Sequence, residues 1–458
     1  MTAEIPKKLG NVSIVEELRF LLVCAFLGSQ IYLVPLMAVG PSWAIWPAAS
    51  DVVIACMVPL SLLPFSSKST VSRTLRGMWT VLLIGAIACL FSYAFFTLYA
   101  LRLDPSVGYS GKSVWFGAAQ LYRVAQALVV YRCAAALSIN PTRIWIMKRL
   151  SLAVFVLICA SVQATYSGLV TTTMLSQHLP ADQATAGPWA DYVVGMREGL
   201  GSIGYNHGYT AIEVLVAGAL CLYFYRRSPL VQSLVPVLVL ASCLVSGSRA
   251  GLLAALFFAL VVWGIRLQTL LLLACCLFAI AAATSLDIAG SAEYLQDAYA
   301  RQGTVRSSLD EDGFSGRTQI WTEKIQYLNA SPKHWIFGFG FGSAIETGTN
   351  AHLEYLHVIL ETGLIGLCAL AYWQWRIISS LWHAGKAARP LFWVCIALLL
   401  TCLDQESLYP VAAYPIFLSF YIFAITICLR AEDHPVDRVS FAHKSRRNER
   451  GSGQLAYQ

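Results

Sequence analysis

Apolar residues recur along the chain in runs of about 20, separated by polar connections. A helix of this length crosses the hydrocarbon core of a bilayer, and the alternating pattern of barrel strands does not occur in the sequence. We therefore predict an all-α polytopic membrane protein with about twelve transmembrane helices. The predicted spans are residues 18–39, 44–65, 78–101, 114–136, 150–170, 208–225, 229–247, 250–265, 267–285, 353–375, 390–409 and 413–429.

The composition supports this class. The 458 residues are 57% hydrophobic and 12% charged, with a mean hydropathy of +0.62. A soluble domain carries about a quarter charged residues. All 13 cysteines lie in or beside predicted spans without a CxxC pair, so we interpret them as small apolar residues rather than as disulfide or metal ligands.

Lysine and arginine set the predicted orientation, because they favour cytoplasmic connections. Alternate connections are rich in these residues, which places both termini and the basic tail at 431–458 in the cytoplasm. We expect this tail to be disordered and to lie near anionic lipid headgroups. The net charge of +7 follows from this asymmetry, and no nucleic-acid partner is expected.

Two predicted outward connections, near 171–207 and at 286–350, are too long to be simple turns. The second contains the helix-like stretches AEYLQDAYARQ and RTQIWTEKIQYLN, which predict an ordered cap between spans nine and ten. The expected organisation is therefore nine helices in 1–285, a cap in 286–350, three helices in 351–430 and the tail.

Four features are expected to meet on the outward side. They are SGSRAG (246–251) with Arg249, FSGRTQIW (314–321) with Arg317 and Trp321, FGFGFGS (337–343), and NAHLEYLHVILETGLIGL (350–367) with His352. Taken alone, the glycine run is more simply a flexible re-entry into the membrane, since it lacks the GKS or GKT ending of a P-loop. Their convergence at one depth makes a site the better interpretation.

Two guanidinium groups and an imidazole suit displacement at a carbon attached to a diphosphate. Guanidinium groups bind phosphate oxygens in pairs, and imidazole accepts a proton near neutral pH. The arginines would stabilise charge on the leaving diphosphate while the histidine deprotonates an attacking alcohol. A diphosphate is already a good leaving group, so neither a metal nor another cofactor is expected, although the connection at 286–350 contains one Asp-x-Asp sequence, at 310–312.

From about residue 200 to 375, the motifs SGSRAG, SGRTQIW with GFGFGS, and AHLEYLHVILETGLIGL resemble, in that order, the bacterial O-antigen ligase and O-antigen polymerase superfamily. The resemblance implies a GT-C-like, inverting, metal-independent glycosyltransferase. It implies an undecaprenyl-diphosphate-linked glycan donor at the outer face of the inner membrane. Arg249 and Arg317 would hold the diphosphate and His352 would be the base. Leu353 stands where the family usually has asparagine, so a role for a side-chain amide there is in doubt.

Other polar residues are secondary candidates. Arg123 lies midway along a predicted span and is either functional or paired with a carboxylate such as Asp404 or Glu406. Asn206 and His207 could contact the acceptor. Trp321 could contact substrate or be structural.

The acceptor decides the reaction. A polymerase extends a second lipid-linked repeat unit, with a chain-length-regulating co-polymerase as a possible partner, whereas a ligase transfers the glycan to lipid A core. We favour the polymerase because SGRTQIW so close to GFGFGS resembles exopolysaccharide polymerases; transfer to a protein hydroxyl is a third outcome. A secondary transporter is the alternative from another class, but transporters place polar groups near the midplane rather than at one rim. If the protein is a glycosyltransferase, we expect Arg249, Arg317 and His352 to line one cavity that opens sideways to lipid.

Overall fold

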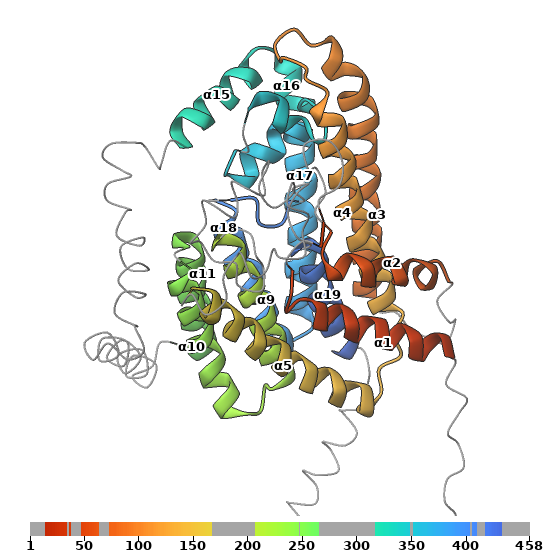
Figure 1. Ribbon diagram of the computed structural model, residues 1–458, viewed down its shortest axis with the longest axis vertical. Helices are drawn as coiled ribbons and strands as arrows, with labels where there is room; N and C mark the ends of the chain where they lie inside the picture. Colours follow the sequence, from red (N-terminus) through yellow and green to blue (C-terminus); the bar gives the residue numbers. More distant parts are fainter. Residues whose placement is uncertain are drawn as a thin grey trace, which may run out of the picture.

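The structure is a computed structural model that describes residues 14–33, 36–37, 47–63, 73–166, 207–246, 248–264, 317–348, 351–403, 405–409 and 417–432. Within these ranges the fold is a bundle of helices without strands, with two short helices at one end (Figure 1). The predicted all-α class is confirmed for this part of the chain.

Helices lie at eleven of the twelve predicted spans, and the span predicted at 267–285 lies outside the described residues. The elements are α1 (Ile14–Ser29), α2 (Ala49–Leu62), α3 (Arg73–Phe91), the π-helix η2 (Ser92–Ala100), η3 (Leu101–Leu103), α4 (Lys112–Ala135), α5 (Pro141–Tyr166), α9 (His207–Phe224), α10 (Pro229–Val245), α11 (Arg249–Trp263), α15 (Arg317–Asn329), α16 (Pro332–Phe337), η5 (Ser343–Thr347), α17 (Glu354–His383), η6 (Lys386–Ala388), α18 (Arg389–Thr401) and α19 (Phe417–Glu432).

Three of the described helices are long and apolar enough to cross a bilayer: Thr74–Leu103, Pro141–Thr165 and Glu354–His383. Several others, such as Pro229–Val245 and Arg249–Trp263, are apolar but shorter. The protein therefore has the apolar helices of a membrane protein. The count of twelve spans and the orientation of the termini stay predictions.

The centre of the bundle is built by α9 and α19, whose side chains are buried on all sides along most of their length. A helix that is apolar all round is expected in such a position. Near their N-terminal ends the rings of Tyr209 and Phe417 stack 4.9 Å apart. Near their C-terminal ends Tyr223 donates a hydrogen bond to Glu432 at 2.9 Å. The two helices therefore run in the same direction.

One end of the bundle, here called the capped end, is covered by α15, α16 and η5, at the top of Figure 1. Asp104, just after η3, lies 2.7 Å from His334 Nε2 of α16. Burial alone would raise the pKa of Asp104, but hydrogen bonds from Ser106, His334 and Lys333 lower it to about 2. The charged carboxylate thus holds α16 against the connection between α3 and α4.

Glu346 of η5 makes a second such attachment. Its carboxylate accepts hydrogen bonds from the backbone amides of Ser110, at 2.7 Å, and Ser113, at 2.9 Å. These amides surround the N-terminus of α4, where free N–H groups and the helix dipole favour an anion. The predicted helix RTQIWTEKIQYLN is confirmed as α15, whereas AEYLQDAYARQ lies outside the described residues.

The glycine run FGFGFGS is a packed connection and not a flexible re-entry, so that interpretation was wrong. Phe339 and Phe341 are buried, and Gly340 and Gly342 have positive φ angles of 108° and 90°. A Cβ at Gly342 would overlap the backbone of Gly117 in α4. Glycine is required here because any side chain would separate this segment from α4.

The same segment forms hydrogen bonds with α17 at a break in that helix. Gly363 has φ 68° and ψ −172°, so the helix is interrupted there and nearby carbonyls lose their helical partners. The amides of Phe339 and Gly340 donate to the carbonyls of Leu360 and Glu361, both at 2.8 Å. The glycine-rich segment therefore supplies the hydrogen bonds that the break removes.

Candidate functional site

At the capped end, three chain segments bring together the residues singled out in the sequence: the N-terminus of α11, the helix α15, and the turn that precedes α17. Arg249 and Arg317 are the first residues of α11 and α15. His352 lies two residues before the start of α17. Each of the three side chains is partly buried, so each retains some exposure.

The SGSRAG motif fixes where Arg249 is presented. Ser248 is the N-cap of α11, and its hydroxyl accepts a hydrogen bond from the amide of Gly251 at 3.0 Å. A Cβ at Gly251 would overlap Ala211 of α9, so the glycine allows α9 and α11 to approach closely. The small residues thus place Arg249 at the end of a tightly packed helix pair.

One face of α15 points into the capped end, because Arg317, Trp321 and Lys324 follow a helical spacing. Trp321 Nε1 donates to the carbonyl of Ala351 at 2.8 Å, which attaches α15 to the residue before His352. Lys324 is buried and donates to the carbonyl of Thr347 at 2.7 Å. Burial lowers the pKa of Lys324 to about 8, although nearby carboxylates oppose the shift. Trp321 therefore has a structural contact beside the candidate site.

The electrostatic environment of Arg317 connects it to Arg249. Burial lowers the pKa of Arg317, the positive charge of Arg249 lowers it further, and the carboxylate of Glu406 raises it. Two guanidinium groups that repel each other are stabilised by an anion placed between them. The pair is thus suited to bind a multiply charged group.

His352 shares this environment. Burial lowers the pKa of its imidazole, Glu406 raises it, and the positive charges of Arg317, His357 and Lys324 lower it. The net shift is downward from the usual value of about 6.5, so the ring is neutral at neutral pH. A neutral imidazole can accept a proton. The electrostatic coupling therefore links Arg249 to Arg317 and Arg317 to His352.

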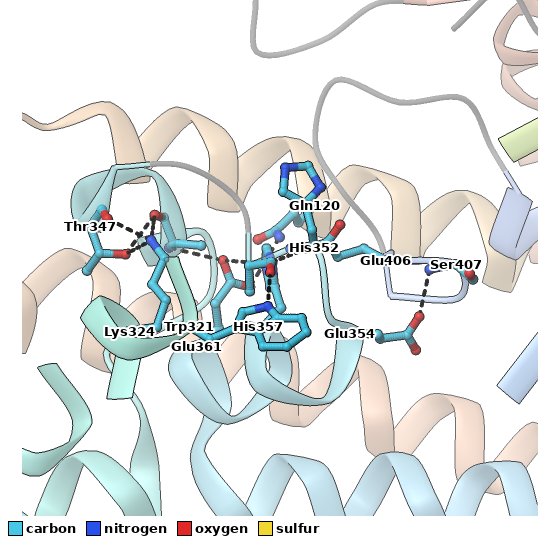
Figure 2. A network of polar contacts seen from close by, with 12 residues as sticks. Gln120, Trp321, Lys324, Thr347, His352, Glu354, His357, Glu361, Glu406 and Ser407 are labelled. Carbon is cyan, nitrogen blue, oxygen red and sulfur yellow. Dashed lines mark hydrogen bonds and ion pairs between the residues drawn. The ribbon is translucent and has the colours of Figure 1, made fainter. Parts of the chain in front are cut away.

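Behind His352 lies a network of buried polar side chains (Figure 2). Glu406 Oε1 accepts a hydrogen bond from the backbone amide of His352 at 2.8 Å and lies 3.2 Å from His357 Nδ1. His357 Nε2 lies 3.3 Å from Glu361, which accepts a hydrogen bond from Gln120 of α4 at 3.2 Å. These four side chains are almost fully buried.

Glu354, the first residue of α17, holds the connection that carries Glu406. Its carboxylate accepts hydrogen bonds from the amides of Ser407, at 2.8 Å, and Leu408, at 2.7 Å. Its own amide donates to the carbonyl of Cys402 at the end of α18. The charged residues at the start of this apolar helix are therefore engaged with the neighbouring connection.

Sequence reasoning missed most of this network. Glu406 was considered only as a partner for Arg123, and Glu361 and Gln120 were not considered. The spacing of His357 and Glu361, four residues apart on one helix face, was an available signal. Nothing in the sequence pointed from Glu406 to His352.

Arg123 is paired with a carboxylate that the sequence did not single out. Its guanidinium lies 2.6 Å from Asp51 of α2, and both side chains are almost fully buried. Asp51 also accepts hydrogen bonds from the Tyr122 hydroxyl, at 3.0 Å, and from Gln126, at 2.6 Å. Pairing with Glu406 was therefore wrong, and Asp404 lies outside the described residues. Arg123 stabilises the contact between α2 and α4.

The two acceptor candidates remain predictions. Asn206 lies outside the described residues, and so does the side chain of His207, the first residue of α9.

Comparison with known proteins identifies one family. Residues 234–371 match the family model described as O-antigen ligase. This region contains Arg249, Arg317 and His352 together with the glycine-rich segment and the first part of α17. No curated protein matches the chain. The family match confirms the resemblance of this membrane protein to the O-antigen ligase and O-antigen polymerase superfamily.

Proposed function

We propose that the protein is an inverting glycosyltransferase of the bacterial inner membrane. It transfers a glycan from undecaprenyl diphosphate to an acceptor hydroxyl at the periplasmic face. The acceptor is a second lipid-linked repeat unit, so that the reaction lengthens an O-antigen or exopolysaccharide. His352 acts as the base, and Arg249 and Arg317 bind the diphosphate.

In this reaction the acceptor hydroxyl attacks the anomeric carbon of the donor from the face opposite the diphosphate. His352 takes the hydroxyl proton as the new carbon–oxygen bond forms. The bond between the anomeric carbon and the diphosphate oxygen breaks, and its electron pair stays on the diphosphate. Because the diphosphate is a stable anion, it leaves without being protonated, and inversion at the anomeric carbon follows from the single displacement.

The two arginines lie on different helices, and both bind the diphosphate. Arg249 is fixed at the first residue of α11, whereas Arg317 begins a helix of the cap. A diphosphate bound between them would relieve the repulsion that lowers the pKa of Arg317. Binding would strengthen as negative charge accumulates on the leaving group, which is the stage at which the stabilisation accelerates the reaction.

The observation that carries the proposal is the electrostatic coupling of Arg249 to Arg317 and of Arg317 to His352. The three side chains come from segments far apart in the sequence, and each belongs to the region that matches the O-antigen ligase family. A neutral imidazole beside two guanidinium groups suits proton abstraction next to a departing anion.

Transfer to lipid A core is the second candidate, since the family model carries the description O-antigen ligase. The test is to incubate the purified protein with undecaprenyl-diphosphate-linked repeat units, with and without lipid A core. Longer lipid-linked chains in the absence of core support the polymerase. Products formed only with core replace it with the ligase, and no product under either condition overturns glycan transfer.

A further inference from the structure

Glu406 is placed to control the candidate base although it is separated from it by 54 residues. It lies in the connection between α18 and α19 and is 2% exposed. Its Oε1 atom accepts the backbone N–H of His352 at 2.8 Å, while the His352 ring projects away from the carboxylate (Figure 2). The contact therefore holds the backbone of His352 and leaves the ring available to substrate.

The backbone at His352 needs such support. Its φ angle is +49°, the only positive value at a non-glycine residue within the described ranges. A residue other than glycine or asparagine in this conformation costs on the order of 1 kcal/mol and persists only when its surroundings impose it. The neighbouring residues are fixed as well, by Trp321 at Ala351 and by Cys402 at Glu354.

Glu406 is itself held in place from two sides. Glu354 binds the amides of Ser407 and Leu408, which fixes the chain directly after Glu406. His357 stands between the carboxylates of Glu406 and Glu361, at 3.2 and 3.3 Å. Nδ1 makes a hydrogen-bond contact with Glu406, whereas Nε2 is near Glu361 without hydrogen-bond geometry. The imidazole thus separates the two buried carboxyl groups.

The charge of Glu406 also acts on the groups of the proposed reaction. It opposes the effect of burial on the pKa of both His352 and Arg317. The other charged groups that act on His352 are Arg317 and Lys324, from α15, and His357, from α17, and all three are positive. Glu406 is therefore the anion that offsets three cations around the imidazole.

We propose that Glu406 is a positioning residue for His352: it fixes the left-handed backbone that directs the imidazole, and its negative charge stabilises the imidazolium formed when the acceptor proton is taken. This inference rests on the proposed function. The arrangement performs the task that a carboxylate performs behind a catalytic histidine, but it acts through the backbone amide and through space rather than through a ring nitrogen.

Three variants test the proposal. Glu406→Gln keeps an oxygen that can accept the His352 amide but removes the charge, and Glu406→Ala removes both. Glu346→Gln is the matched control, because this carboxylate also lies at the capped end but binds α4 rather than His352. Two measurements are needed: glycan transfer as a function of pH, and the pH dependence of diethylpyrocarbonate modification of His352, followed by peptide mass spectrometry.

For Glu406→Gln we expect kcat to fall about 10-fold or more with little change in KM for the donor. The midpoint of His352 modification should move to lower pH by roughly one unit, because an adjacent negative charge has been removed. The acidic limb of the pH–rate profile should move with it. Glu406→Ala should lose more activity than Glu406→Gln, and Glu346→Gln should leave the midpoint where it is.

The modification experiment separates this inference from the proposed function, since it needs no turnover. If His352→Ala still transfers glycan, the proposed base is wrong, yet the midpoint still reports whether Glu406 acts on His352. If His352→Ala is inactive but Glu406→Gln has wild-type kcat and an unchanged midpoint, the positioning role is overturned. If Glu406→Gln does not fold, Glu406→Asp keeps the charge but withdraws it, and a midpoint equal to wild type with full kcat would also contradict the proposal.

Discussion

Two clusters of buried charged side chains lie in this bundle. One surrounds Asp51 and joins α2 to α4. The other surrounds Glu406, in the connection between α18 and α19, and lies beside the start of α17. The first is closed: Asp51 is bonded to Arg123, Gln126 and Tyr122, and its other oxygen accepts the amide of Ala48. The second extends from Gln120 through His357 to the backbone of His352 and is electrostatically coupled to Arg317. The two clusters are equally buried but differently connected.

The difference teaches that a buried charge in an apolar helix is by itself a poor sign of function. Arg123 was a functional candidate because charged residues are costly in a membrane. The partners described for it, Asp51 and Gln126, make a structural contact between α2 and α4. Glu406 belongs to a cluster whose last member is a partly exposed imidazole on which the charge of Arg317 acts. Connection to an accessible group, and not burial, distinguishes the candidate site.

Removal of the base should give the largest change in activity. His352→Ala should lower glycan transfer by about 10²- to 10⁴-fold, the usual contribution of a general base. Expression and melting temperature should stay close to wild type, because the ring projects away from the buried network. The measurement is transfer by purified protein from a lipid-linked donor. Full activity of this variant would remove histidine from the mechanism.

The opposite result is expected at the closed cluster. Arg123→Leu leaves Asp51 without its cation and should destabilise the protein by about 3 kcal/mol, measured as a fall in the melting temperature in detergent. The double variant Arg123→Leu and Asp51→Leu should recover part of the loss. Transfer per folded molecule should be nearly unchanged in both. A large loss of kcat without loss of stability would return Arg123 to the list of functional residues.

A conservative change should separate charge from geometry in the candidate site. Arg317→Lys keeps a positive charge but cannot form two parallel hydrogen bonds with a phosphate group, so transfer should fall about 10- to 100-fold. The loss should be seen in the rate of transfer measured at a saturating concentration of acceptor. Wild-type kinetics for this variant would show that bidentate binding of the diphosphate is the wrong picture.

The smallest effects should come from two glutamines in α4. Gln126 donates to Asp51 and Gln120 donates to Glu361, and both are buried. Each change to Leu should cost about 1–2 kcal/mol in stability, because a hydrogen bond to a charged group is lost. Only Gln120→Leu should also lower kcat, by a few-fold, since Glu361 supports His357. Equal effects on kcat would indicate that the two clusters are not functionally different.

The sequence was sufficient to predict where helices lie, because apolar runs of membrane length are a strong signal. The positions of α4, α9 and α10 agree with their predicted spans to within a few residues. The meeting of Arg249, Arg317 and His352 could be predicted from topology, because alternate helix ends lie on the same side of a bundle. The family resemblance was predicted from the order of the motifs, and the match over residues 234–371 confirms it.

What could not be predicted were contacts that depend on exact helix ends and partners. Residue 409 was the predicted end of a span, but α18 ends at Thr401, so Glu406 lies in a connection and reaches His352. Asp51 is 72 residues from Arg123, and several carboxylates were equally plausible partners. The break at Gly363 was not expected, because glycine is common in transmembrane helices and its φ angle is not written in the sequence.

That break explains why a long apolar helix begins with histidines and glutamates. The length from Leu364 to His383 is 20 residues, which at 1.5 Å per residue is about 30 Å, the thickness of the hydrocarbon layer. The length after the break is therefore sufficient to cross the bilayer. The length before it, Glu354–Thr362, is not needed for the crossing, and its ionisable side chains are buried against other segments of the protein. Gly363, with its positive φ angle, thus divides α17 into a length that can cross the bilayer and a length that carries ionisable side chains.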